Sequence, residues 1–436
     1  MKEPTIKDIH KEINKWNKQK YGFGDGLIID KIFSFINRFQ PETKEELEAN
    51  VKKWLNLCEK ERPTYNHKDH ISNWDTSLIT DMSDLFMGET EFNDDISKWD
   101  TRKVINMESM FNGTYKFNQP IGNWDTSNVE NMKCMFSGAI NFNQNIGNWD
   151  TRKVENMKDM FMYVKNFNQP IGNWNTNRVK NMAYMFLYAE NFNQHIGNWD
   201  TRKVENMQSM FRNAEKFNQP IGNWNTGNVK NMNCMFEFAK NFNQHIGNWK
   251  TGNVENMTEM FSLAKKFNQP IGSWDTGTVI NMKSMFNGAT NFNQPIGNWD
   301  TRNVETMSGM FSFAKNFNQP IENWETDNVR NMRTMFMCAE NFNQPIGRWN
   351  TGKVENMERM FRYSEKFNQP IGTWDTRKVE NMKSMFRDAE NFNQPIGNWD
   401  TRKVENMQSM FNGTKKFNQP IGNWDTGNVR EKKRRR

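Results

Sequence analysis

The sequence predicts an elongated repeat solenoid, built of stacked 25-residue coils and preceded by a small helical segment. Fifteen tryptophans recur every 25 residues, from Trp74 to Trp424. The pattern F-N-Q-P-I-G-N-W-D-T-x-x-V-x-N-M-x-x-M-F-x-x-A-x-x accompanies them from about residue 71 to residue 429. One such unit is too short to bury its own apolar side chains, so neighbouring units have to stack and share them.

The composition alone favours disorder, whereas the spacing opposes it. Hydrophobic residues make up 35% of the chain, and the mean hydropathy is -0.96. Globular proteins are usually ~45–50% apolar. A disordered chain needs no fixed spacing of Phe, Ile, Trp, Val and Met, but these residues keep one register through the repeats. We therefore expect a folded array.

The first 65 residues predict a small helical bundle that leads into the array. "TIKDIHKEINKW" and "LIIDKIFSFINRF" have apolar residues at helical spacing, and the glycines of "YGFGDG" separate them. A third helix is predicted in "PETKEELEANVKKWLNLCEKE", where Thr43 and Glu46 have the spacing of a capping box. The apolar stripe of this helix comprises Leu47, Val51, Trp54, Leu55 and Cys58.

Residues 66–429 form the predicted solenoid. Within a coil, "PIGNWDT" indicates an extended segment with a turn, "VENM" a short parallel strand, and the stretch from the first Met to the Ala one helical turn. We expect the Trp column to be core and not an exposed stacking platform, because each coil needs its apolar mass. The predicted core columns are represented by Trp124, Trp249, Phe117, Val129, Met132, Met135 and Phe136. Stacked asparagines are expected to hydrogen-bond from coil to coil.

The positive charge lies at the end of the sequence. The net charge is +7, and Arg430 to Arg436 hold six cations and one anion, which leaves +2 for the rest. The tail, residues 430–436, has two interpretations: a nuclear-import or polyanion contact through Lys432, Lys433, Arg434, Arg435 and Arg436, or a solvated end that prevents edge pairing. The position after the repeat Val alternates in sign, for example Glu155 and Lys180, so we expect any polyanion to bind the tail and not this column.

The segment "FNQPIGNWDTSNVENMKCMFSGA", Phe117 to Ala139, resembles the tandem repeat of BspA-like bacterial surface proteins. These are leucine-rich-repeat-like proteins of mycoplasma and Listeria type, with relatives in protists and large DNA viruses. The resemblance covers about 360 of the 436 residues. It implies a leucine-rich-repeat-like solenoid used for interaction, without catalytic residues. Unlike the bacterial members, this sequence has no signal peptide, lipobox or wall anchor. This difference predicts an intracellular protein, which includes a nuclear or a viral one. A location at the cell surface is the alternative.

The polar residues that recur in the repeat indicate turns and not catalytic or metal-binding sites. The Asp of "NWDT" is replaced by Asn175 or Lys250 without other change, which is typical of an Asx or Ser/Thr turn. His67 and His70 form an H-x-x-H without further ligands nearby, and His195 and His245 are expected ~10 Å apart on the surface. The four cysteines form no close pair and are interpreted as free thiols. We expect no catalytic residue, no cofactor and no metal site.

The predicted function is a non-enzymatic repeat scaffold that binds another macromolecule, most favourably a protein. The alternative is a polyanion- or nucleic-acid-binding protein that is anchored by the basic tail, with the solenoid as a spacer. No window has the ~18 uninterrupted apolar residues of a membrane span. The identity of the partner and the face that binds it do not follow from the sequence.

Overall fold

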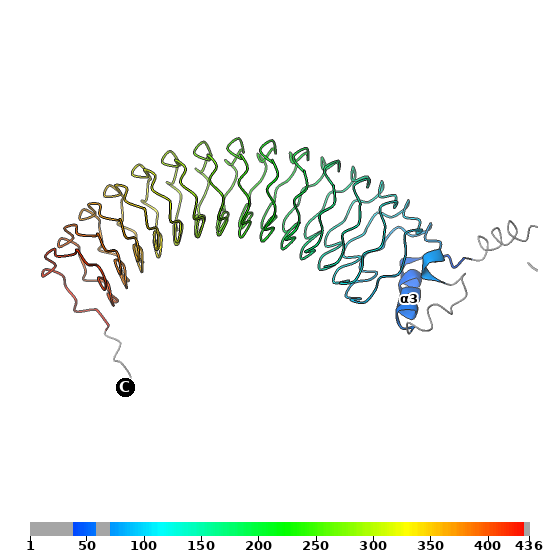
Figure 1. Cartoon of the computed structure of the whole chain (residues 1–436), viewed down its shortest axis with the longest axis horizontal. Coiled ribbons are helices and arrows are strands. Elements are labelled where there is room, and N and C mark those ends of the chain that lie inside the picture. The colour runs from blue at the N-terminus through cyan, green and yellow to red at the C-terminus, as the bar shows by residue number, and fades with distance from the viewer. Residues whose placement is uncertain (1–37, 58–69, 431–436) are drawn as a thin grey trace, which may run out of the picture.

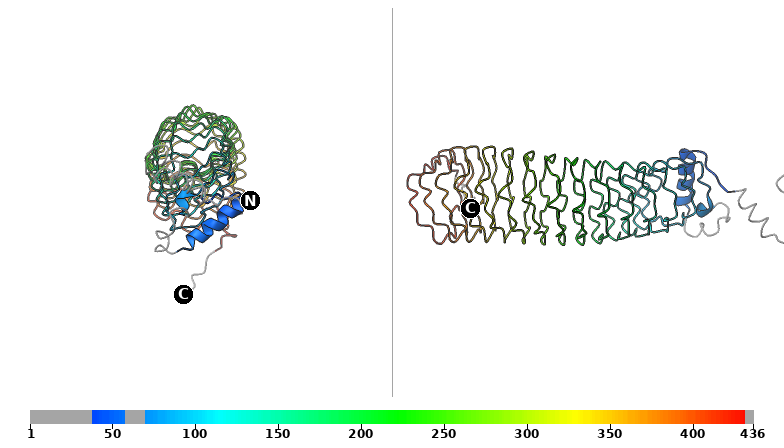
Figure 2. Two further views of the ribbon diagram at one scale, coloured as in Figure 1. Left: turned by 90° about the vertical axis from the view of Figure 1, so that its right-hand side faces the viewer. Right: turned by 90° about the horizontal axis from the view of Figure 1, so that it is seen from above.

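The computed structural model describes residues 38–57 and 70–430. It is a curved stack of 25-residue coils that follow one another in chain order, with helix α3 at the first end (Figure 1). Seen from above, the coils lie in a single row (Figure 2). The array is therefore one solenoid, as predicted. The first two predicted helices, Cys58, His67 and the tail from Lys432 to Arg436 lie outside the described residues.

Helix α3 (Lys44–Leu55) covers the apolar end of the first coil. Its start is capped as expected: the Thr43 side chain accepts a hydrogen bond from the Glu46 N–H. Leu47, Val51 and Trp54 are buried against the first coil, which opens with the short 3₁₀ helix η2 (Ile71–Asn73). Without such a cover, the first coil would expose its apolar columns to water.

On one side of the stack, neighbouring coils are joined by backbone hydrogen bonds. The N–H groups of Met182, Tyr184, Phe186 and Tyr188 donate to carbonyl groups 24 residues further on, at 2.8–3.1 Å. The regular bridges between coils are parallel and one residue long, and they run from Asp81↔Asn106 to Asn381↔Asn406. We call this side the ladder side.

The predicted strand and helical turn are not formed as such within the described coils. On the ladder side, two residues of every coil take positive φ, for example Tyr184 at 59° and Tyr188 at 58°. This left-handed conformation is incompatible with both a strand and a right-handed helix. The segment therefore runs as successive turns with single-residue bridges.

On the opposite side, side chains link the coils. The Asn118 N–H donates to the Asn93 Oδ1 at 2.9 Å, and the Trp124 indole N–H donates to the Ile96 carbonyl at 3.2 Å. The Thr126 hydroxyl donates to the Asp150 carbonyl of the next coil at 3.0 Å. The Thr column takes part in a turn in each coil, since the Val129 N–H donates to the Thr126 carbonyl at 2.9 Å; its side chain is also buried and ties the coils together. The asparagine after the Phe does bond from coil to coil, but its partner is a backbone N–H.

The two kinds of linkage explain the curvature. Between neighbouring coils, the rings of Tyr163 and Tyr188 on the ladder side are 4.8 Å apart, those of Phe161 and Phe186 5.7 Å, and those of Trp174 and Trp199 6.4 Å. Only the ladder side keeps the ~4.8 Å spacing of hydrogen-bonded strands. Because the smaller spacing must lie on the inside of an arc, the ladder side is the concave side in Figure 1.

The core is one continuous cluster along the array. Trp124 is 4% exposed and Trp249 is 3% exposed, so the Trp column is no stacking platform. The other predicted core residues are fully buried: Phe117, Val129, Met132, Met135 and Phe136. Each coil thus rests on its neighbours for the burial of its aromatic side chains.

Candidate interaction surface

The repeats differ from one another chiefly on the ladder side. The columns of Trp, Thr and Ile on the other side stay nearly constant, whereas five columns, whose members range from buried to exposed, change from coil to coil. We call these five columns the inner face; they comprise the residues that follow Ser83, Asp84, Met87, Gly88 and Thr90 at intervals of 25. Other positions vary as well, and most of their side chains are exposed or half-buried; they include the residue after the repeat Val, the two residues after each Thr, the Pro position and the residue before the Phe. Each coil therefore offers different chemistry on the concave side.

Two columns of the inner face hold left-handed residues. Among the residues that the structure describes, twenty-two other than glycine have positive φ, and all belong to the columns of Asp84 and Gly88. This conformation costs roughly 1–2 kcal/mol for a residue with a Cβ. Glycine serves at Gly113 and Gly138, yet Tyr163, Phe313 and Tyr363 occupy the same column. Glycine would relieve the backbone strain at these positions. The presence of large residues there indicates that their side chains have a function.

An apolar groove of about 380 Å³ lies on the inner face. Tyr115, Ile140 and Tyr163 line it and are 48%, 39% and 47% exposed. Gly138 forms part of the floor, where an added Cβ would lie 3.4 Å from the Gly113 backbone. Exposed tyrosines are typical of the centres of protein interfaces.

Charged residues beside this groove are mostly paired between coils. Lys165 and Glu190 form an ion pair at 2.9 Å, and Lys240 pairs with Glu215 at 2.5 Å. In the column after the repeat Val, Lys180 pairs with Glu155 at 2.7 Å. The alternation of sign in that column does not continue to the end, because three glutamates follow in succession: Glu355, Glu380 and Glu405.

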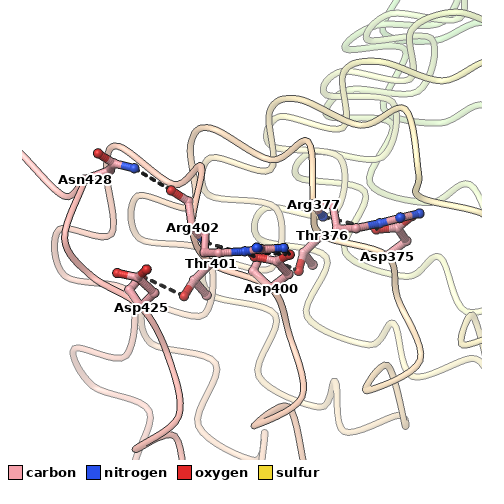
Figure 3. Close-up of polar contacts among 8 residues, drawn as sticks. All are labelled: Asp375, Thr376, Arg377, Asp400, Thr401, Arg402, Asp425 and Asn428. Atoms are coloured by element: carbon pink, nitrogen blue, oxygen red, sulfur yellow. Dashed lines mark hydrogen bonds and ion pairs between the residues drawn. The ribbon is translucent and has the colours of Figure 1, made fainter.

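The Asp of "NWDT" forms a turn with the arginine two residues later (Figure 3). Asp400 Oδ1 accepts from the backbone N–H and the Nε of Arg402 at 3.1 and 3.0 Å. These bonds lower the pKa of the Asp400 carboxyl to about 2. Asn175 makes the same backbone contact with Asn177 at 3.1 Å, which explains why Asn replaces Asp here. The carboxylates of this column therefore serve to close turns.

An open depression of about 530 Å³ lies at the same edge, near the end of the array. Asp375 and Asp400 are each engaged by their own arginine, Arg377 or Arg402. The other lining residues are Gly352, Lys378 and Lys403. Four cationic and two anionic side chains line this depression, so an anion fits it better than it fits the apolar groove of the inner face.

The structure describes three of the histidines that the sequence analysis considered. His195 and His245 are exposed, and His70 lies against the Trp54 ring while its side chain accepts a hydrogen bond from the Ser72 N–H.

The inner face was not predicted from the sequence. The signal was present in the unspecified positions of the repeat, because reading them at intervals of 25 shows which side chains share a column.

Comparison with known families matches most of the array. Five overlapping segments match the family described as "Mycoplasma protein of unknown function, DUF285": residues 56–170, 142–244, 218–307, 265–364 and 341–435. No curated protein matches the chain. Within residues 38–57 and 70–430, no helix is both long and apolar enough to cross a membrane.

Proposed function

Because this chain belongs to the DUF285 family of Mycoplasma proteins of unknown function, and its repeats form one solenoid, we propose that it is a non-enzymatic scaffold that binds another macromolecule on its inner face. The observation that carries this proposal is the coincidence of three features on one side: concavity, variation between repeats, and strained exposed aromatics. Solenoids present extended concave surfaces of this kind to their partners.

A protein is the partner that the inner face favours. Its exposed anchors are tyrosine and phenylalanine, the residue types enriched at protein interfaces. Many of its charges are paired across coils, as in Lys165–Glu190, Lys240–Glu215 and Lys315–Glu340, so its field is too weak to attract a polyanion. The resemblance to BspA-like, leucine-rich-repeat-like repeats supports the same class of function.

The absence of enzymatic activity is part of the proposal. The polar residues that recur in every coil are used by the fold: Thr126 and Asn118 join coils, and Asp400 closes a turn. Such groups have partners and are repeated along the array, whereas a catalytic centre needs a unique constellation.

Binding of a polyanion is the second candidate, and the cationic depression favours it. Lys378 and Lys403 lie there beside two arginines that their own carboxylates neutralise. This interaction would weaken steeply with salt, because phosphate contacts release counterions. Salt dependence therefore separates this function from protein binding at the inner face.

The test is site-specific photo-cross-linking with the full chain. A photoreactive residue is placed at Tyr163 on the inner face or, as a matched control, at the exposed Asn173 on the outer side of the same coil region. We expect one protein to be captured from position 163 and not from position 173. Equal capture from both positions, or capture from position 173 alone, would exclude the inner face as the binding surface.

A further inference from the structure

Three metal-binding side chains converge at one place on the inner face. Cys234, Glu237 and Glu259 each have a ligand atom within 4.8 Å of the others, and among the described residues they form the one such group. Cys234 and Glu259 occupy the same left-handed column in neighbouring coils, and Glu237 follows Cys234 by three residues. Cys234 and Glu237 are buried, at 8% and 6% exposure. The stacking thus places a thiol and two carboxylates around one point.

Polar atoms without hydrogen bonds surround the same point. Glu237 Oε2 is buried and accepts no hydrogen bond; Arg212 Nε lies 2.8 Å away as an ion-pair partner, but it is not aligned to donate. The buried hydroxyl of Thr258 also has no hydrogen bond, and its residue is adjacent, since the Cys234 N–H donates to the Thr258 carbonyl at 2.9 Å. Glu237 Oε2 and Arg212 Nε thus have each other as ion-pair partners, whereas the Thr258 hydroxyl, beside this cluster, has no hydrogen-bond partner among the described residues. Buried polar atoms of this kind call for a missing partner such as an ion or a water.

We propose that Cys234, Glu237 and Glu259 bind a divalent zinc ion. The donor set of one thiolate and two carboxylates suits zinc, which accepts both sulfur and oxygen ligands in a tetrahedral arrangement. A tetrahedral ion with a Zn–S bond of about 2.3 Å and a Zn–O bond of about 2.1 Å holds these two atoms about 3.6 Å apart. Cys234 Sγ lies 3.6 Å from Glu259 Oε2.

Charge balance supports the same ion. One thiolate, two carboxylates and one Zn²⁺ sum to −1, and two cations lie beside them, Arg212 at Glu237 and Lys283 at 4.0 Å from Glu259, so the anionic donors are compensated when the site is loaded. Binding breaks the S–H bond of Cys234, forms a Zn–S bond, and releases the proton to solvent. The thiol now donates to Asn233 Oδ1 at 2.5 Å, and this bond is given up in the exchange. The inference stands apart from the proposed function.

The chain contains a natural comparison for this site. Four coils earlier, Cys134 and Asp159 occupy the same column, with Sγ and Oδ2 3.8 Å apart. The third position there is Ser137 in place of a glutamate. A cysteine and one carboxylate are therefore present, but the set of three donors is not.

The test is metal titration of the reduced, metal-free full chain. Zinc is titrated in competition with a chromophoric chelator, and cobalt is titrated to detect the thiolate-to-metal charge-transfer band. We expect one ion per chain; Cys234→Ser should weaken binding at least about 100-fold and remove the band, and Glu237→Gln should weaken it about 10-fold or more. Cys134→Ser should bind as the unchanged protein does. Circular dichroism and thermal unfolding verify that each variant is folded.

A gain-of-site variant keeps the test decisive if Cys234→Ser does not fold. Ser137→Glu supplies the third donor beside Cys134 and Asp159, and we expect the stoichiometry to rise from one to two ions per chain. The proposal is overturned if the unchanged protein shows no charge-transfer band with cobalt. It is also overturned if folded Cys234→Ser and Cys134→Ser bind zinc equally, or if Ser137→Glu leaves the stoichiometry unchanged.

Discussion

At two positions in every coil, the backbone takes the left-handed conformation, and most of these positions are not glycine. The ladder hydrogen bonds hold it there: the Phe313 N–H donates to the Met337 carbonyl at 2.7 Å while its side chain stays 44% exposed. Such a residue contributes little packing to its own coil. Its side chain is therefore free to serve recognition, and its backbone strain is carried by the array.

This account predicts the order of two substitutions at one position. Phe313→Gly should be more stable than Phe313→Ala by about 1 kcal/mol, because only alanine has a Cβ that opposes positive φ. The measurement is the midpoint of urea unfolding for both variants. If alanine were the more stable, the left-handed conformation at this column would be wrong.

The Asp–Arg turns predict a dependence on acid. The pKa of the Asp400 carboxyl is lowered from 3.8 to about 2, with the hydrogen bonds of Arg402 as the largest cause. A lowered folded-state pKa stabilises the protein above pH 3.8, and this stability is lost as the pH falls through about 2. The same lowering occurs at five equivalent carboxyls: Asp100, Asp150, Asp200, Asp300 and Asp375.

A pair of charge-matched variants tests this dependence. One variant changes six arginines to Gln: Arg102, Arg152, Arg202, Arg302, Arg377 and Arg402. The control changes six lysines to Gln, the five that directly follow these arginines and Lys353 at the equivalent position of another coil: Lys103, Lys153, Lys203, Lys353, Lys378 and Lys403. The arginine variant should unfold at higher pH than the lysine variant in an acid titration. Coincident titration curves would refute a role for these turns in stability.

At the scale of the element, the coil is stabilised by its neighbours. Trp249 is 3% exposed, and its indole N–H donates to the Ile221 carbonyl of the preceding coil at 3.1 Å. Its loss removes a core side chain and the hydrogen bond between the two coils, so that the Ile221 carbonyl keeps the Trp224 N–H of its own coil as a donor. Since stacked repeats interact with their nearest neighbours, the damage should be local.

Trp249→Ala should cost ~3–5 kcal/mol. Hydrogen exchange should accelerate most in the coils on either side of residue 249 and least near α3 and near Trp424. The control is an exposed change in the same coil, Asn248→Ala, which should leave exchange unchanged. Uniform acceleration along the whole array would contradict nearest-neighbour coupling.

Much of the coil could be predicted from the sequence. The recurrence of Trp124 and its equivalents at 25 residues predicted the core columns, and Thr43 with Glu46 predicted the start of α3. The left-handed columns could not be predicted, because Tyr163 and Cys234 are not glycines and carry no signal of positive φ. The cluster of Cys234 and Glu259 was missed because their separation of 25 residues becomes proximity only once the coils are stacked.

At the scale of the whole molecule, two linkages of different length bend the array. Backbone bonds draw the ladder side together, while Trp, Asn and Thr side chains hold the other side apart. The ring spacing of 4.8 Å at Tyr163 and 6.4 Å at Trp174 expresses this difference. As a result, the columns that vary between repeats lie together on the concave surface, where one elongated partner contacts many coils.

The central claim is tested most directly by measuring how tightly the partner captured from position 163 binds three proteins: the unchanged protein, an inner-face variant and an outer variant. The inner-face variant carries Tyr163→Gly, Phe313→Gly and Tyr363→Gly, which the left-handed backbone tolerates. The outer variant carries Asn173→Gly, Asn323→Gly and Asn398→Gly at exposed positions. We predict that the inner-face variant stays folded and binds at least about 30-fold more weakly, as expected for the loss of aromatic hot spots, while the outer variant binds like the unchanged protein. Full affinity of the inner-face variant, with loss in the outer variant, would contradict the assignment of the binding surface.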